Sequence, residues 1–386
     1  MHNMPISKGS VESLAASHLH TSGRLILDVH GHVARIAGIN WFGLETPTFA
    51  PHGLGVRGFK DMMCQMKQLG FNTIRLPFCS ELFDAASRPN GIDFTRNPDL
   101  MGRDGLGIID KIVEHAENLG LRIILDHHRS EAGFGPNENG LWFTDKYPES
   151  SWIAIWSMLA SRYADNPTVI GADLHNEPHG PATWGSGDPS NDWRLAAERA
   201  GNAILAVNPR WLIIVEGVEN AQSGYYWWGG NLSNAGAFPV RLDIPGQRVY
   251  SAHDYPASVY NQPWFDNSHY PKNLSAIWNK NWGYLVRQNI APVFLGEFGS
   301  KLTTHSDRQW LRELVRFLNS NGEADSDFEH QGMSWAWWSW NPDSSDTGGI
   351  LNDTWNAVDQ KKINALSPAI FPFPGSRPAV FPNTYV

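Results

Sequence analysis

The sequence predicts an α/β fold: a (β/α)8 barrel (TIM barrel) with an N-terminal β-hairpin. Short apolar runs typical of buried strands alternate with segments of helical periodicity along the 386 residues. Strands separated by helices imply right-handed crossovers and a parallel sheet, and eight such units favour a closed barrel over an open sheet. Ionisable residues also collect where the predicted strands end, which is the active face of barrel enzymes.

The predicted elements follow one another without an internal boundary. Residues 24–40 are expected to form a hairpin that turns at Gly31, runs into the first barrel strand and plugs the closed end of the barrel. The eight strands are predicted at 33–40, 72–78, 121–128, 169–177, 211–216, 249–255, 291–298 and 332–340. Helices are predicted at 59–69, 106–119, 152–164, 192–206, 279–288 and 308–319, and glycines 70 and 120 are expected to cap the first two.

The chain is expected to hold one domain. Residues 1–23 are polar and predicted to be loosely held, residues 24–371 form the predicted barrel, and residues 372–386 form a proline-containing tail. The two cysteines, Cys64 and Cys79, lack the spacing of a metal site, and we interpret them as free and buried.

Composition excludes several classes of function. The net charge of −9 argues against nucleic acid or an anionic membrane as a partner. No apolar stretch approaches the length of a membrane-spanning helix, and no signal peptide is visible. The 18 tryptophans are more than a core needs, because Trp rarely buries completely, so some are expected to line an open surface. Flat indoles suit the apolar faces of sugar rings.

The fourth predicted strand ends in Asn176-Glu177-Pro178. Proline cannot donate to a strand ladder, so the strand is expected to finish at Glu177, and the residue before a proline is expected to be extended. Taken alone, this glutamate could equally be a helix N-cap or a salt-bridge partner.

The ends of the other strands favour a catalytic interpretation. Glu177 and Glu297 end the fourth and seventh strands, and two carboxylates that face one cavity suggest an acid/base pair or an acid with a nucleophile. In glycoside hydrolysis, a separation of about 5 Å indicates the retaining route. Asn176 could bond a sugar hydroxyl, whereas Arg75 and Tyr255 would favour the ionised form of Glu297. We therefore predict Glu177 as acid/base with a raised pKa and Glu297 as the nucleophile.

The remaining candidate residues also have structural interpretations. Glu216 is interpreted as a structural ion-pair partner. His175 and His179 have the spacing of a zinc pair on a helix, but Pro178 forbids that helix, so no metal and no cofactor is expected. Trp41 could be a core aromatic or a substrate contact. Trp228, beside two glycines, is interpreted as a loop platform for a sugar ring.

Five motifs in order resemble glycoside hydrolase family 5, and most closely its bacterial endo-β-1,4-glucanases (cellulases). They are Asn-Glu-Pro at 176–178, Arg-Leu-Pro at 75–77, His-Asp-Tyr at 253–255, Gly-Glu-Phe-Gly at 296–299 and the Trp-rich segment 335–340. The resemblance extends over residues 40–371. It implies that Arg75 steadies the nucleophile Glu297, that His128 is the strand-three histidine, and that Asn176 holds the sugar 2-hydroxyl beside the acid/base Glu177.

The resemblance also implies that His253 and Tyr255 are the strand-six pair, with Tyr255 donating to the nucleophile. Trp338 matches the indole beneath the sugar at subsite −1, and Trp41 and Trp228 are added as candidate substrate contacts. The expected activity is retaining hydrolysis of internal β-1,4 bonds in cellulose or related β-glucans. A β-mannanase or xyloglucanase on the same barrel remains an alternative. So does a non-catalytic carbohydrate-binding barrel, which would keep the aromatics but could lose a carboxylate. A secreted monomer whose only partner is the polysaccharide is expected, from the size of the substrate and the habit of the family.

Overall fold

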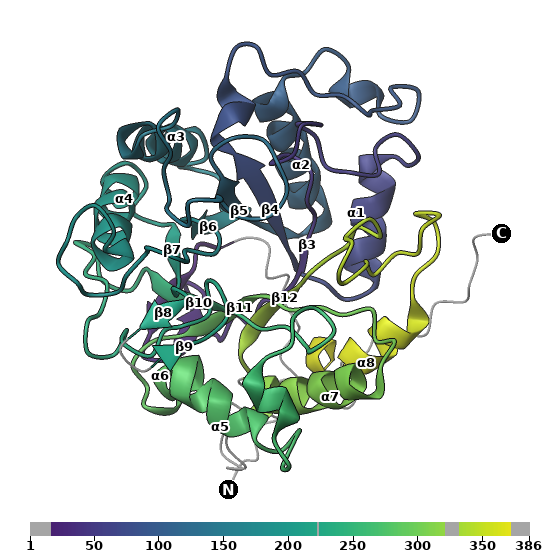
Figure 1. The fold of residues 1–386 in the computed structure, drawn as a ribbon. Coiled ribbons are helices and arrows are strands. Elements are labelled where there is room, and N and C mark those ends of the chain that lie inside the picture. The colour runs from purple at the N-terminus through teal and green to yellow at the C-terminus, as the bar shows by residue number, and fades with distance from the viewer. Residues whose placement is uncertain (1–16, 222–223, 321–331, 372–386) are drawn as a thin grey trace, which may run out of the picture.

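In the computed structural model, residues 17–221, 224–320 and 332–371 are described. Eight parallel strands close into a barrel in the order β10-β11-β12-β3-β4-β5-β6-β7, with the helices packed around it (Figure 1). The strands are β3 (Ala37–Asn40), β4 (Thr73–Cys79), β5 (Arg122–Arg129), β6 (Val169–Asp173), β7 (Leu212–Glu216), β10 (Arg248–His253), β11 (Val293–Glu297) and β12 (Ser334–Trp337). The predicted fold class is confirmed.

The outer layer is helical, and its apolar faces pack on the barrel. Its members are α1 (Phe59–Gln68), α2 (Gly105–Leu119), α3 (Glu149–Arg162), α4 (Trp193–Val207), α5 (Leu274–Trp278), α6 (Tyr284–Arg287), α7 (His305–Ser320) and α8 (Gln360–Ile370). A π-helical turn at Asn279–Gly283 joins α5 to α6. Gly70 and Gly120 follow α1 and α2 with φ of 95° and 66°, as expected for glycines that end helices. Helix α8 was not predicted, because Pro368 within it marks a break in the sequence pattern.

The N-terminal hairpin differs in detail from the prediction. β1 (His20–Ser22) pairs antiparallel with β2 (Leu25–Leu27) across a turn at Gly23. The turn at Gly31 also forms, but it closes only a single bridge between Leu27 and Val33. The prediction that residues up to 23 are loosely held was therefore wrong for 17–23. Residues 1–16 and the tail 372–386 lie outside the described residues.

The hairpin segment fills the closed end of the barrel, as predicted. Its apolar side chains form one buried cluster with inward-facing residues of the strands. From the N-terminal segment come Leu19, Ile26, Ala34 and Ile36, and from the strands Ile124, Ile170, Leu212, Ile214, Val249, Phe294 and Ala336. Because this end is sealed, the accessible end is the one where the strands finish.

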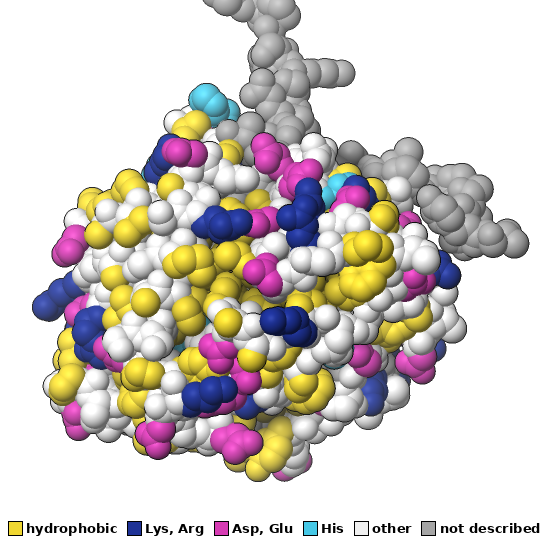
Figure 2. All heavy atoms as spheres, turned by 90° about the horizontal axis from the view of Figure 1, so that it is seen from above, with side chains coloured by type: hydrophobic (Ala, Val, Ile, Leu, Met, Phe, Trp, Pro, Cys, Tyr) yellow, Lys and Arg dark blue, Asp and Glu magenta, His cyan; other side chains and the backbone are white. Residues whose placement is uncertain are grey.

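The outer surface carries mixed charge. Figure 2 shows acidic and basic side chains interspersed over one side of the molecule. Across the described ranges, no helix combines the length and the apolarity needed to cross a bilayer. Both cysteines are free; Cys79 is buried as expected, but Cys64 is only partly so.

Asp254, directly after β10, ties outer elements to the open end of the barrel. Its buried carboxylate accepts hydrogen bonds from Tyr226 Oη at 2.5 Å, Trp278 Nε1 at 3.0 Å and Trp310 Nε1 at 2.6 Å. Burial raises the pKa of this carboxyl to about 6, although the three donors act in the opposite direction. Its backbone N–H also donates to Glu297 O at 3.1 Å. The chain leaving β10 is thereby fixed against α5 and α7.

Replacing this acceptor should destabilise the fold. Asp254→Ala leaves three buried donors without an acceptor, and each such group costs about 1–3 kcal/mol. We expect the free energy of unfolding in urea to fall by at least about 3 kcal/mol. Asp145→Ala, at an exposed position, is the matched control. Equal stability of the two variants would contradict the assigned role of Asp254.

Candidate active site

Arg75, in the middle of β4, lies beneath the open end of the barrel and is completely buried. Burial opposes its charge, but the surrounding carboxylates outweigh this and raise its pKa well above the usual value. Its guanidinium donates to Asp173 at 2.8 Å, Glu297 at 2.7 Å, Glu216 at 3.0 Å, Asn176 at 3.1 Å and Asn40 at 3.1 Å, and lies 3.1 Å from Asp126. One cation thus contacts side chains from most of the neighbouring strands.

Glu177 does not have the predicted backbone. Strand β6 already ends at Asp173, and Glu177 adopts a positive φ of 51° instead of an extended conformation. The prediction was wrong because hydrogen bonds to other strands outweigh the preference of a pre-proline residue for extended backbone. The Glu177 N–H donates to Glu216 Oε2 at 2.7 Å, and the Asn176 N–H donates to His127 O at 3.0 Å. Glu216, interpreted from sequence as a structural partner, therefore holds the turn that carries Glu177.

The passage of a second loop behind Glu177 requires a glycine. Gly229 has a φ of 66°, and a Cβ there would lie 2.3 Å from Glu216 Oε2 and 3.2 Å from Glu177 Cα. Any larger residue would push on the contact between Glu216 and Glu177. The loop can consequently place its neighbour Trp228 at the rim beside the glutamate.

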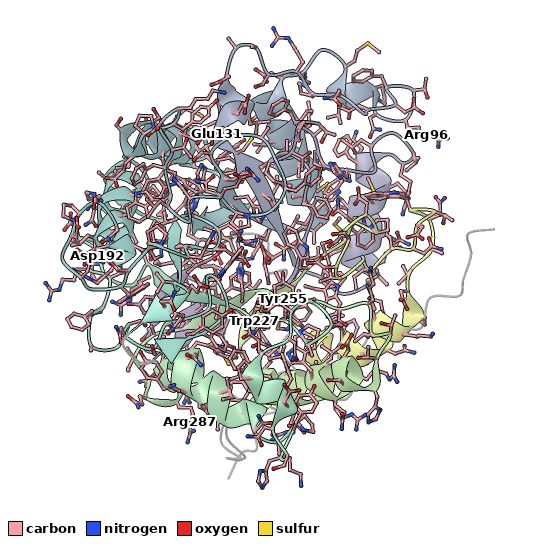
Figure 3. The ribbon with its side chains drawn as sticks, viewed as in Figure 1. Arg96, Glu131, Asp192, Trp227, Tyr255 and Arg287 are labelled. Carbon is pink, nitrogen blue, oxygen red and sulfur yellow. The ribbon has the colours of Figure 1, made fainter. Side chains whose placement is uncertain are left out.

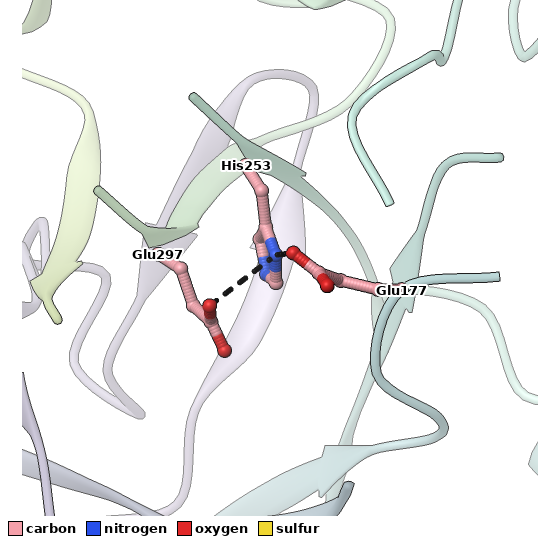
Figure 4. Close-up of side chains that lie close together, drawn as sticks. All are labelled: Glu177, His253 and Glu297. Carbon is pink, nitrogen blue, oxygen red and sulfur yellow. Dashed lines mark hydrogen bonds and ion pairs between the residues drawn. The ribbon is translucent and has the colours of Figure 1, made fainter. Parts of the chain in front are cut away.

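His253, at the end of β10, lies between the two predicted catalytic glutamates (Figure 4). Its Nδ1 is 2.9 Å from Glu177 Oε1 and 3.6 Å from Glu297 Oε2, and its Nε2 is 3.3 Å from Glu216 Oε1. Burial opposes protonation, but these carboxylates raise the pKa of His253 well above its usual value. One oxygen of Glu177 and one of Glu297 lie within 4.8 Å of each other. Both glutamates therefore face one small space.

The two glutamates differ in surroundings. Burial raises the pKa of Glu177 to about 6; the hydrogen bond from His253 opposes the rise and the charge of Glu297 adds to it. Glu297 accepts from Arg75 Nη1 at 2.7 Å and from Tyr255 Oη at 2.7 Å, so each of its oxygens has a donor. Burial and the neighbouring Glu297 raise the pKa of Tyr255 well above its usual value, which keeps its hydroxyl a donor. Glu177 is thus the glutamate with the raised pKa, whereas both carboxylate oxygens of Glu297 accept hydrogen bonds.

Of the two adjacent histidines at the end of β5, His128 and not His127 lines the cleft. His128 Nδ1 is 2.7 Å from Asp126 Oδ2, and its ring stacks on Trp338 at 5.4 Å. Burial lowers the pKa of His128, but Asp126 outweighs this and raises it to about 8. His127 points away from the cleft, and its Nδ1 lies 2.9 Å from His175 Nδ1. Burial lowers the pKa of His127 to about 3, so this second histidine is neutral.

A cleft of about 690 Å³ opens above these residues. Trp338 lines it, whereas Trp337 and Trp340 are fully buried. Trp228 is 41% exposed and stacks on His179 with ring centroids 3.9 Å apart. Figure 3 shows Trp227 and Tyr255 close together near the centre of the barrel, and their rings meet edge to face at 6.0 Å. Further lining residues are Phe42, Glu45, Phe134, Gly135, Pro136, Glu219, Tyr225, Val259, Tyr260, Asp343, Ser344, Ser345 and Asp346.

The prediction that Trp41 contacts the substrate was wrong. It is fully buried, and its Nε1 donates to His52 O at 3.1 Å, so it cannot touch a ligand in the cleft. The neighbouring Phe42 lines the cleft instead and stacks on Trp338 at 5.4 Å. The first barrel strand ends at Asn40. In the segment that follows, Phe42 faces the cleft and Trp41, the residue expected there, faces the core.

Sequence reasoning missed the acidic residues around Arg75. Asp126 and Asp173 pair in register on β5 and β6, and both are completely buried. A signal for them was present, since a charged residue inside an apolar strand needs a buried partner. The cleft-lining loop residues carried no comparable signal, because loops leave no periodicity from which an orientation can be derived.

Two groups of side chains in the described part of the chain have the spacing of metal ligands: Glu177, His253 and Glu297, and the trio Asp126, Asp173 and Glu216. The guanidinium of Arg75 already occupies the place of a cation among the second group. In the first group, the raised pKa of His253 favours the protonated ring, which cannot ligate a metal. The chemistry of both sets favours hydrogen-bonded carboxylates over a metal centre.

Comparison with known proteins adds the evolutionary context. The family model described as cellulase (glycosyl hydrolase family 5) matches residues 29–344. An endoglucanase from Paenibacillus polymyxa is 50% identical over 90% of this chain and 86% of its own length. The major extracellular endoglucanase of Xanthomonas campestris pv. campestris is 42% identical over 91% of this chain and 71% of its own length.

Solved structures agree with this relationship. A variant of the endocellulase from Pyrococcus horikoshii in complex with cellotetraose superposes with a TM-score of 0.83 at 40% identity, covering 92% of this chain and 99% of that one. The catalytic domain of the Xanthomonas campestris enzyme has a TM-score of 0.83 at 39% identity, with coverage of 92% and 100%. The chain belongs to glycoside hydrolase family 5.

Proposed function

We propose that this protein is a retaining endo-β-1,4-glucanase that hydrolyses internal bonds of cellulose or related β-glucans. The observation that carries the proposal is the pair Glu177 and Glu297, whose oxygens approach within 4.8 Å inside an open, aromatic-lined cleft. A gap near 5 Å suits double displacement, whereas inverting enzymes need about 6.5–9.5 Å to admit a water between the carboxyls. The names of the Paenibacillus and Xanthomonas relatives support the same substrate class.

In the first step, Glu297 attacks the anomeric carbon while Glu177 gives its proton to the departing glycosidic oxygen. The bond from Glu297 to carbon forms as the bond from carbon to oxygen breaks, and the first product leaves with the proton of Glu177. Arg75 and Tyr255 each hold one oxygen of Glu297, which aims the carboxylate and reduces the reorganisation that attack requires.

In the second step, Glu177 takes a proton from water, and the water oxygen attacks the same carbon to release Glu297. Asn176 is suited to hold the 2-hydroxyl of the reacting sugar. Its Oδ1 accepts from Arg75 Nη2 at 3.1 Å, which leaves the amide N–H group free to donate into the cleft. Trp338, which lines the cleft and stacks on His128, is the candidate indole for the same sugar.

The remaining expectations are part of the same proposal. We propose that the enzyme acts outside the cell as a monomer on a polysaccharide and without a cofactor. An extracellular site is supported by the name of the Xanthomonas relative and by the size of the substrate. Residues 24–371 would form the catalytic domain, extended at its start by the strand at His20–Ser22.

A substrate panel tests the proposal. Reducing ends released from carboxymethylcellulose, mannan and xyloglucan should show the highest rate on the cellulose derivative. Glu297→Gln, which keeps the shape but removes the nucleophile, should lower that rate by at least about 1000-fold. A faster rate on mannan would reassign the substrate, and substantial turnover by Glu297→Gln with an unchanged melting temperature would remove its assigned role.

Loss of the acid/base should be partly reversible. Glu177→Ala lacks the base that activates water in the second step, and a small anion can enter the space left by the side chain. Azide is therefore expected to raise turnover of an aryl cellobioside by this variant at least about tenfold, with a glycosyl azide as product. Azide should leave the wild type unaffected. Failure of rescue in a folded variant would argue against Glu177 as the base.

The pH profile should report the raised pKa of Glu177. The proton of Glu177 is needed in the first step, so kcat/KM on cellotetraose should fall as pH rises through about 6. Dinitrophenyl cellobioside has a leaving group that needs no proton, and with it this decline should be absent. An identical decline with both substrates would assign it to another group.

The charge of the cleft predicts a salt effect. Six acids line it, Glu45, Glu177, Glu219, Glu297, Asp343 and Asp346, against one basic side chain, His128. Anionic carboxymethyl groups are repelled, and salt screens this over about 10 Å at 0.1 M. We expect kcat/KM on carboxymethylcellulose to rise about two- to fivefold between 0.01 and 0.3 M NaCl, with little change on uncharged hydroxyethylcellulose. Glu219→Gln should weaken the response, whereas Glu117→Gln on the outer face of α2 should not.

A further inference from the structure

We propose that Phe134 is a platform for an additional glucosyl residue at the edge of the cleft and that Arg129 positions it. The inference rests on the proposed function and extends it to a longer segment of the glucan. Phe134 is 72% exposed, more than Met101 at 65% or Tyr260 at 64%, and it lines the cleft. A large apolar ring left in water at the entrance of a ligand site indicates a contact made only with the ligand.

The loop that carries Phe134 is partly exposed, and the buried guanidinium of Arg129 lies beneath it. Arg129, at the end of β5, is 9% exposed, and its guanidinium donates to three carbonyl groups of the loop. They are Glu131 O at 2.7 Å, Phe134 O at 2.6 Å and Gly135 O at 3.3 Å. Three contacts from one planar group fix the path of the backbone, so the direction of the Phe134 side chain is set before any ligand binds.

Two further contacts tie the same loop to its surroundings. Gly133 passes so close to the guanidinium that a Cβ would lie 2.5 Å from Arg129 Cζ, and its N–H donates to Glu45 O at 2.9 Å. The Ala132 N–H donates to Glu81 Oε2 at 2.9 Å. A loop held by these hydrogen bonds loses little conformational entropy when a ligand binds.

The groups beside Phe134 have the chemistry of a sugar site. The ring of His52 meets Phe134 edge to face at 6.5 Å, and His52 Nδ1 is 2.7 Å from Asp343 Oδ2. Glu45 and Asp343 also line the cleft. Glu45 Oε2 accepts from the Gly43 N–H at 2.7 Å. An apolar face bordered by carboxylate acceptors fits a pyranose ring, which presents C–H groups on its face and hydroxyls around its edge.

The position of Phe134 distinguishes it from Trp228, another exposed aromatic residue of the cleft. Trp228 contacts His179 and belongs to the loop after β7, whereas Phe134 belongs to the loop after β5 and contacts His52 of the loop after β3. Two platforms in separate sectors of the barrel mouth, joined by one continuous cleft, suit a chain that crosses the mouth. This continuity favours the polysaccharide over a protein partner as the occupant.

The test compares long and short substrates. Phe134→Ala should lower kcat/KM on cellohexaose about tenfold, mainly through KM, and should change kcat/KM on dinitrophenyl cellobioside less than twofold. Phe134→Tyr, which keeps the ring, should retain the wild-type ratio. Phe238→Ala removes another exposed phenylalanine, 42% exposed and outside the cleft lining, and serves as the matched control. Arg129→Lys should lower the same ratio without affecting the short substrate.

Each result decides the matter. An unchanged ratio of long to short substrates in Phe134→Ala would overturn the inference, and so would an equal loss on both, which indicates a general structural effect. Calorimetric binding of cellohexaose to Glu297→Gln, with and without Phe134→Ala, separates the two proposals. If the wild type hydrolyses no glucan but Phe134→Ala still weakens binding about tenfold, the platform stands and the proposed activity fails. If binding is also unchanged, the platform is excluded.

Discussion

The site depends on one buried interaction, the guanidinium of Arg75 among the carboxylates of Asp126, Asp173, Glu216 and Glu297. Taking these charges out of water is costly, and only close pairing with further hydrogen bonds offsets that cost. Removing one member of such a cluster is more destabilising than replacing the whole cluster by apolar side chains, because the partners that remain are buried and unpaired. The charge cluster also constrains the register of the strands, because each carboxylate contacts the same cation from a different strand.

Both predicted catalytic glutamates are fastened to this cluster, but by different routes. Glu297 touches Arg75 directly, while Glu177 is reached through Glu216, which contacts Arg75 with one oxygen and the Glu177 N–H with the other. The positive φ of Glu177 is a consequence of the second route, since the backbone N–H must point down at Glu216. The strained backbone of this candidate catalytic residue is thus held by the carboxylate of Glu216.

The sequence was sufficient for what periodicity and strand ends determine. The eight strands and most helices were predicted within a few residues, because apolar runs and capping glycines report local structure directly. The orientation of Trp41 was not, because Trp41 lies beyond the end of its strand, where the apolar pattern no longer determines which side chain faces the cleft. The backbone conformation of Glu177 was also not predicted, because it depends on a partner that lies 39 residues away in sequence. The role suggested for Phe134 depends on Arg129 bonds to loop carbonyls, which no side-chain pattern encodes.

The closeness of the two glutamates also explains how one side chain could serve as acid and then as base. The charge of Glu297 is one of the causes that raise the pKa of Glu177. When Glu297 becomes an ester in the covalent intermediate, that charge disappears while His253 still donates to Glu177. In the proposed mechanism, losing this charge lowers the pKa of Glu177, which favours its action as a base in the second step. In the proposed mechanism, the short separation that suits double displacement therefore also couples the pKa of Glu177 to the state of Glu297.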